Sequence, residues 1–150
     1  METKQYLNQI GRLDRMIKNK MSELAQYKEL AYGLSAVANE EKVKSSTSSF
    51  DKIGIKIAKI VEMEEKINNL IDEYVDLKEE ALKTINMISN IRYRKILYKK
   101  YFKYKSIYVI AKELGMTDRG CKKAHKRALE EFAKNTISCG NIDSSLQDMV

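Results

Sequence analysis

The chain has 150 residues and a formal net charge of +7; 43% of its residues are hydrophobic, and it contains no proline and only six glycines. Because these two helix-breaking residues are rare and Lys, Glu, Leu, Ile and Ala are abundant, the composition predicts an all-α fold. No apolar run approaches the ~20 residues of a membrane span, and the charged segment 1–15 resembles neither a signal peptide nor a membrane anchor. We therefore expect no membrane partner.

The positive charge is concentrated in one part of the chain. Residues 92–134 contain 14 basic and 4 acidic side chains, a balance of +10, whereas residues 1–91 contribute −1 and residues 135–150 contribute −2. This asymmetry is typical of a protein that binds a phosphate backbone. The two cysteines, Cys121 and Cys139, lack the spacing of metal ligands. We expect reduced thiols, a cytoplasmic location and no metal or other cofactor.

Two long helices are predicted in the first part of the chain. The first covers about residues 3–31 and carries apolar side chains at steps of three and four, with Gly33 as its expected end. A Ser/Thr-rich linker is expected at about 34–51, and a second helix at about 52–89. Both apolar stripes are narrow, as in coiled coils, so we predict a long antiparallel helical hairpin over residues 1–89. Its remaining apolar surface suggests a homo-oligomer, with a dimer expected.

A DNA-binding domain is predicted at residues 90–135. Asn90 is a candidate cap for a basic helix over 91–102, and six aromatic residues lie between Tyr93 and Tyr108. Aromatic side chains interleaved with lysine can stack on single-stranded bases, but a Tyr-rich helix more often packs a small core, and we favour the core. The remaining residues, 136–150, have no apolar period and are expected to form a disordered tail.

Residues 107–129 predict a helix-turn-helix. One short helix covers Ile107 to Leu114, Gly115 is expected at the turn, and Thr117 is the candidate cap of the next helix. At 100° per residue, the inner face of the second helix carries small apolar residues and the opposite face carries basic ones. The inner residues are Cys121, Ala124 and Ala128, and the outer residues are Arg119, Lys122, Lys123 and Lys126. This is the pattern of a recognition helix that enters a major groove.

The segment RYRKILYKKYFKYKSIYVIAKELGMTDRGCKKAHKRALEEF resembles region four of the sigma-70 family of RNA polymerase factors. The family's Leu-x-x-Arg-Tyr-Phe-like string corresponds to Leu97, Lys100, Tyr101 and Phe102, and its Arg/Lys-Ala-Leu signature corresponds to residues 127–129. With the long helical part that precedes it, the chain resembles the small phage and prophage regulators of the ArpU and RinA type. The resemblance implies control of late or packaging genes, double-stranded DNA as a partner, and RNA polymerase as a further candidate partner.

The resemblance also implies which residues contact DNA. The base-reading positions of the family correspond to residues at the start of the recognition helix, and later basic residues would hold phosphates. The candidate DNA-binding residues are Asp118, Arg119, Lys122, Lys123, Lys126 and Arg127. Gly120 departs from the family, which usually has a longer polar residue at this position.

The sequence also bears on two other functional classes, enzymes and phage terminase small subunits. His125 is the only histidine, and we expect it at the margin of the recognition helix as a surface residue or a phosphate contact. The sequence has no Ser/His/Asp set, metal cluster or phosphate-binding glycine loop, so we do not expect an enzyme. A phage terminase small subunit also combines a helix-turn-helix with a helical oligomerisation part, and it would recognise packaging sites on viral DNA and form a ring rather than a dimer. This is the main alternative.

Overall fold

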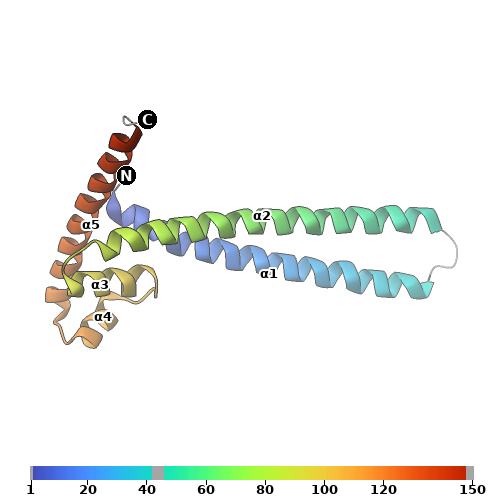
Figure 1. Ribbon diagram of the computed structural model, residues 1–150. Coiled ribbons are helices and arrows are strands. Elements are labelled where there is room, and N and C mark those ends of the chain that lie inside the picture. The colour runs from blue at the N-terminus through green and yellow to red at the C-terminus, as the bar shows by residue number, and fades with distance from the viewer. Residues whose placement is uncertain (1, 42–45, 148–150) are drawn as a thin grey trace. The chain divides into compact units, whose positions relative to one another are not determined.

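The computed structural model describes the backbone of residues 2–41 and 46–147 and the side chains of residues 2–33 and 51–136. Every regular element in these residues is a helix, which confirms the all-α prediction (Figure 1). None of the described helices has the length and apolar character needed to cross a bilayer. In chain order the helices are α1 (Thr3–Glu41), α2 (Ser46–Asn86), α3 (Ile91–Tyr101), α4 (Ile107–Leu114) and α5 (Asp118–Gln147).

The chain forms two compact units, one of Met1–Arg12 with Val75–Val150 and the other of Leu13–Tyr74. The first unit is therefore larger than the segment 90–135 predicted to form the DNA-binding domain. Leu7, Ile10 and Ile85, which come from the start of α1 and the end of α2, are almost completely buried. The ring of Tyr6 lies against that of Phe132 on α5, with centroids 6.0 Å apart. The start of α1 and the end of α2 thus belong to the same compact unit as α5.

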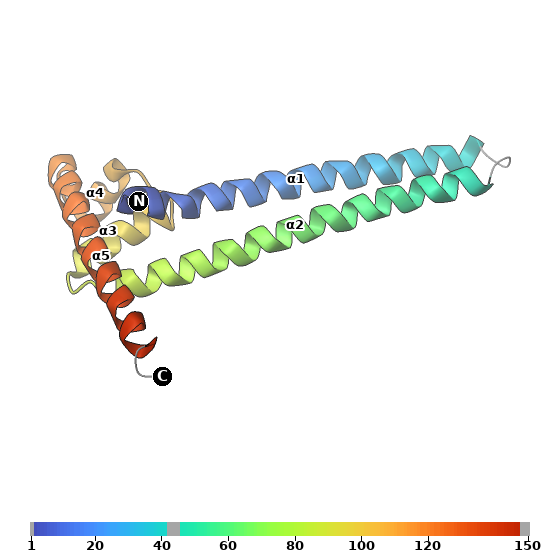
Figure 2. The same ribbon diagram turned by 90° about the horizontal axis from the view of Figure 1, so that it is seen from above.

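In the first unit, α3, α4 and α5 pack against one another, and both views show α3 and α4 beside the beginning of α5 (Figures 1 and 2). One apolar cluster lies between these three helices. It contains Ile96, Ile110, Ala111, Cys121 and Ala124. Because α4 and α5 each direct two of these residues into the cluster, the cluster fixes how the two helices are rotated about their own axes.

In the second unit, buried side chains recur at steps of seven residues on both long helices. Ile17 and Ala31 are buried on α1 and Ile60 and Ile67 on α2, and Leu24 continues the α1 series as a half-buried residue. A seven-residue step is the repeat of a coiled-coil seam, as predicted from the narrow apolar stripes.

Contacts across this unit join the two helices. Lys28 Nζ lies 2.9 Å from Glu64 Oε1, and Lys59 Nζ lies 5.9 Å from the centre of the Tyr27 ring. The two segments are drawn side by side in both views (Figures 1 and 2). The turn of the predicted hairpin, residues 42–45, lies outside the described residues, so the complete hairpin stays a prediction.

The prediction of a linker at 34–51 is wrong over most of this range, because α1 continues to Glu41 and α2 begins at Ser46. Gly33 was expected to end the first helix but lies inside α1. Among the described residues only Tyr104 and Gly115 have a positive φ, so Gly33 does not make a left-handed turn. The alanines and glutamates that follow Gly33 favour helix, and a single glycine costs too little to stop it.

The last helix is also longer than predicted. α5 continues to Gln147, whereas residues 136–150 were expected to form a disordered tail. Thr136 is still bonded within the helix, because its hydroxyl donates to the carbonyl oxygen of Phe132 at 2.9 Å. No proline occurs in this stretch, so no residue forces the backbone out of the helix. Residues 148–150 lie outside the described part of the chain.

Two glycine substitutions test the fold. In Gly115→Ala, the added Cβ meets no atom within 4 Å, but the left-handed φ of 66° should destabilise the protein by about 1–2 kcal/mol. In Gly54→Ala, the Cβ also meets open space, but the backbone is helical, so we expect stabilisation by about 1 kcal/mol. Denaturant titration of both full-length variants measures the free energy of unfolding. A shift of the same sign in both variants would contradict the special role of Gly115.

Candidate nucleic-acid interface

The helix that precedes the helix-turn-helix begins where the sequence predicts. Asn90 has an extended backbone, and its side-chain oxygen accepts hydrogen bonds from the backbone N–H groups of Arg92, at 2.9 Å, and Tyr93, at 3.4 Å. These bonds satisfy two N–H groups that have no partner inside the helix. The predicted cap is confirmed, and it sets the start of α3 at Ile91.

The turn after α4 has the geometry of a Schellman motif. Gly115 adopts φ 66° and ψ 35°, and its N–H donates to the carbonyl oxygen of Lys112. The N–H of Met116 donates to the carbonyl oxygen of Ala111 at 2.8 Å, and the Met116 side chain packs against the apolar cluster. The predicted role of Gly115 is confirmed. Ser106, whose hydroxyl accepts from Val109 N–H at 3.3 Å, is the cap of α4 and was not predicted.

Thr117 caps α5, as predicted. Its hydroxyl accepts a hydrogen bond from the N–H of Gly120 at 3.1 Å, and Asp118 places a negative charge in the first turn, where the helix dipole favours it. A Cβ on residue 120 would lie 3.0 Å from the Thr117 hydroxyl oxygen. The glycine that departs from the sigma-like pattern therefore leaves room for the cap.

One face of α5 is buried and the opposite face is exposed. Cys121, Ala124 and Ala128 are buried, as predicted, and burial raises the pKa of the Cys121 thiol. All six candidate DNA-binding residues are exposed on α5: Asp118, Arg119, Lys122, Lys123, Lys126 and Arg127. Within the described residues, none of the five basic members forms an ion pair or a side-chain hydrogen bond. Their charged groups therefore face solvent, while the opposite face of α5 packs against the apolar cluster.

His125 does not lie at the surface, and this prediction is wrong. Its side chain is buried, and its Nε2 lies 2.9 Å from the hydroxyl oxygen of Tyr101 on α3. Burial, reinforced by the positive charges of Lys100 and Lys4, lowers the pKa of His125 to about 4. Burial also raises the pKa of Tyr101 to about 12. Both side chains are neutral at pH 7, and their hydrogen bond joins α5 to α3.

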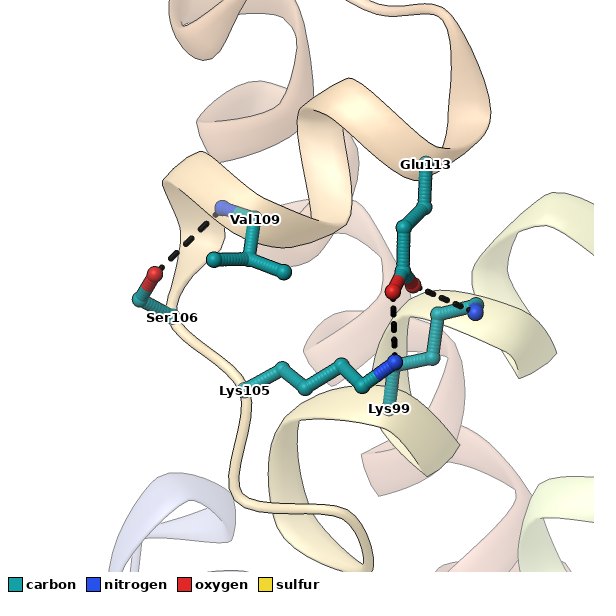
Figure 3. A network of polar contacts seen from close by, with 5 residues as sticks. All are labelled: Lys99, Lys105, Ser106, Val109 and Glu113. Carbon is teal, nitrogen blue, oxygen red and sulfur yellow. Dashed lines mark hydrogen bonds and ion pairs between the residues drawn. The ribbon is translucent and has the colours of Figure 1, made fainter.

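A carboxylate joins α4 to α3 and to the loop between them (Figure 3). Glu113 accepts from Lys99 Nζ at 2.6 Å and from Lys105 Nζ at 2.5 Å, and these bonds lower the pKa of its carboxyl group. The network is partly exposed, so each ion pair contributes little to stability alone. It neutralises part of the charge of these two lysines. The sequence gives no signal for this network, because its members are 8 and 14 residues apart.

The aromatic residues of this region divide between core and surface. Tyr101 and Phe102 are buried, and Tyr93 packs against the apolar cluster. Tyr98 is exposed at one edge but stacks on Phe102, with ring centroids 5.3 Å apart. Tyr108 is exposed and lies under Lys112 Nζ, 4.4 Å from the ring centre. The core interpretation holds for the three residues that pack inward.

Comparison of the chain with protein-family models, curated proteins and solved structures finds no match. In the part of the chain whose side chains are described, no group of three or more His, Cys, Asp or Glu side chains could hold a metal ion. The side chain of Cys139 lies outside that part. The candidate interface therefore rests on the geometry of α3, α4 and α5.

The buried histidine predicts a pH dependence of stability. Unfolding exposes His125 and returns its pKa to about 6.5, so between pH 6.5 and 4 the unfolded state binds one more proton than the folded state. The free energy of unfolding should therefore fall as the pH falls through this range, by at most about 1.4 kcal/mol per pH unit from this group. His125→Gln removes the titration, and its denaturant titrations at several pH values should show a smaller slope. Equal slopes in the two proteins would contradict a neutral buried His125.

Proposed function

We propose that the chain binds double-stranded DNA sequence-specifically through α5 and acts as a transcriptional regulator of phage or prophage genes. The observation that supports this function best is the exposed basic face of α5. This face is opposite the buried face of the same helix. The helix begins at a capped N-terminus, and a Schellman turn joins it to α4. A helix presented in this way can enter a major groove while the preceding helix crosses the backbone. The regulatory role follows from the resemblance to sigma region four and to ArpU- and RinA-type proteins.

The basic residues of α5 have different proposed DNA contacts, according to their position along the helix. Arg119 lies in the first turn, where a recognition helix meets base edges, and its guanidinium can donate two hydrogen bonds to a guanine. Lys122 and Lys123 lie one turn later on the same face, within reach of bases or phosphates. Lys126 and Arg127 lie two turns from the start, where a straight helix leaves the groove, so they would hold phosphates and fix the register.

A second copy of the chain would supply a second recognition helix. The second unit leaves large apolar side chains exposed on both of its helices, which supports self-association through this part of the chain. These residues include Met16, Met21, Leu30, Ile53, Ile55, Ile57 and Val61. We propose a homodimer. Light scattering measures the mass in solution: a dimer fits the regulator, whereas a closed ring would favour a terminase small subunit that recognises packaging sites.

The first test of DNA binding is its salt dependence. If the exposed basic residues neutralise about five phosphates, the logarithm of the affinity should fall with the logarithm of salt concentration with a slope of about −4 to −5. Fluorescence anisotropy with a labelled random duplex at several salt concentrations measures this slope. A slope near zero would contradict an electrostatic interface on α5.

The second test separates base contacts from phosphate contacts. The target is first selected from a randomised duplex pool with the full-length protein. Arg119→Ala should then weaken binding to the selected duplex by about 1–3 kcal/mol and change binding to a scrambled duplex little. Lys126→Ala should weaken binding to both duplexes alike and reduce the salt slope by about one.

Lys52→Ala serves as the matched control for these variants. Lys52 is an exposed lysine of α2 in the other compact unit, so its removal lowers the net charge equally without changing α5. It should leave both affinities unchanged. If Arg119→Ala weakened binding to the selected and scrambled duplexes equally, Arg119 would be a phosphate contact and the assignment to base reading would be wrong.

A further inference from the structure

The first unit contains a groove that lies apart from the recognition face of α5. Its volume is about 680 Å³, and it is bordered by the end of α2, by α3 and by the loop that leads to α4. Three large apolar side chains line it while remaining exposed: Leu82 to 37%, Ile91 to 59% and Tyr98 to 40%. Exposed apolar side chains that line one concave surface are a common feature of interaction sites.

The remaining lining is strongly basic. No acidic side chain of the described residues lines this groove, whereas five cationic ones do: Arg94, Lys95, Lys99, Lys103 and Lys105. Glu113 neutralises part of the charge of Lys99 and Lys105, and Lys103 Nζ lies 5.8 Å from the centre of the Tyr98 ring. Within the described residues, Arg94 and Lys95 form no ion pair. The Nε of Arg94 is moreover buried without a hydrogen-bond partner, which is an unfavourable state for a donor.

Helical spacing separates this groove from the helix-turn-helix core. Arg94 and Lys95 lie three and four residues after Ile91, and Tyr98 lies four and three residues after them, so the four share one face of α3. Ile96 and Leu97, which are buried, lie on the opposite side of the same helix, whereas the buried Tyr101 is close in helical phase to Arg94. Because α3 contributes Ile96 to the apolar cluster with α4 and α5, most of its groove face points away from that cluster. A ligand in the groove and a duplex on α5 would therefore contact different surfaces.

The chemistry of the groove distinguishes among anionic ligands. A phosphate backbone would be attracted by the cations but would leave Leu82 and Ile91 facing polar groups. A segment with both acidic and apolar side chains would satisfy both parts of the surface, since its carboxylates could reach Arg94 and Lys95 while its apolar residues cover Ile91 and Leu82. Helices that bind in grooves use this arrangement, with apolar anchors at steps of three and four.

We propose that this groove binds a short acidic amphipathic helix of a partner protein. The apolar residues of the partner lie against Leu82, Ile91 and Tyr98, and its carboxylates pair with Arg94 and Lys95. The loop residues that complete the groove are fixed by backbone hydrogen bonds, because the N–H of Lys105 donates to the carbonyl oxygen of Lys99 at 3.1 Å. The site is therefore formed before the partner binds. A partner bound here could be brought to a DNA site that α5 occupies at the same time.

The test uses the full-length protein and a fluorescein-labelled helical peptide of about 14 residues, with leucines at one face and glutamates elsewhere. Lys95→Glu should weaken peptide binding about tenfold or more, a change of about 1.4 kcal/mol. Arg92→Glu is the matched control, because Arg92 is an exposed residue of the same helix that does not line the groove. Arg92→Glu should change the affinity for the peptide less than about twofold, because Arg92 does not line the groove.

A second variant tests the apolar part. Ile91→Asp should also weaken peptide binding, and circular dichroism should show unchanged helix content because Ile91 is exposed. Replacing the glutamates of the peptide by glutamines should abolish the difference between wild type and Lys95→Glu. Equal losses in Lys95→Glu and Arg92→Glu, or no peptide binding by the wild type, would overturn the proposal. It would also be overturned if Lys95→Glu weakened duplex binding as strongly as Lys122→Glu and left peptide binding unchanged.

Discussion

At Gly115 the chain leaves α4 in a left-handed conformation and enters α5 three residues later. The angle between these helices follows from this turn, because Met116 N–H is bonded to Ala111 and Met116 packs into the cluster beneath it. With the turn fixed, Cys121 and Ala124 are directed inward, and the basic residues of α5 are necessarily directed outward. The surface chemistry of α5 is thus a consequence of how one glycine and a small apolar core hold the helix.

The core of this unit also contains a polar contact that restricts the rotation of α5. An apolar cluster alone tolerates small rotations, since methyl and thiol groups have no directional bonding. The hydrogen bond between Tyr101 and His125 is directional, and it lies on the edge of the buried face, one residue from Ala124. A large rotation of α5 would break it and leave two buried polar groups unpaired, at a cost of about 1–3 kcal/mol for each group. The positions of Arg119 and Lys122 relative to α3 therefore depend on a buried residue of their own helix.

Local signals in the sequence were sufficient for most of the helix-turn-helix. Asn90, Gly115 and Thr117 act on N–H and carbonyl groups within five residues of themselves, so their roles could be predicted from the chain alone. Gly33 was misinterpreted because a glycine ends a helix only when its neighbours also favour a turn, and here they favour helix. His125 was misplaced because its burial depends on Tyr101, 24 residues away. The pairing of Glu113 and the groove beside α3 likewise arise from residues that only the folded chain brings together.

The seven-residue repeat of buried positions in the second unit constrains how the length of this part of the chain can change. Deleting one residue from α1 would rotate every later side chain by about 100° and remove Ala31 from the seam. Deleting seven residues would leave the seam in phase, provided that α2 lost a matching repeat opposite Ile60 and Ile67. This part of the chain can therefore be shortened or extended only in discrete increments of about two helical turns, made on both helices together.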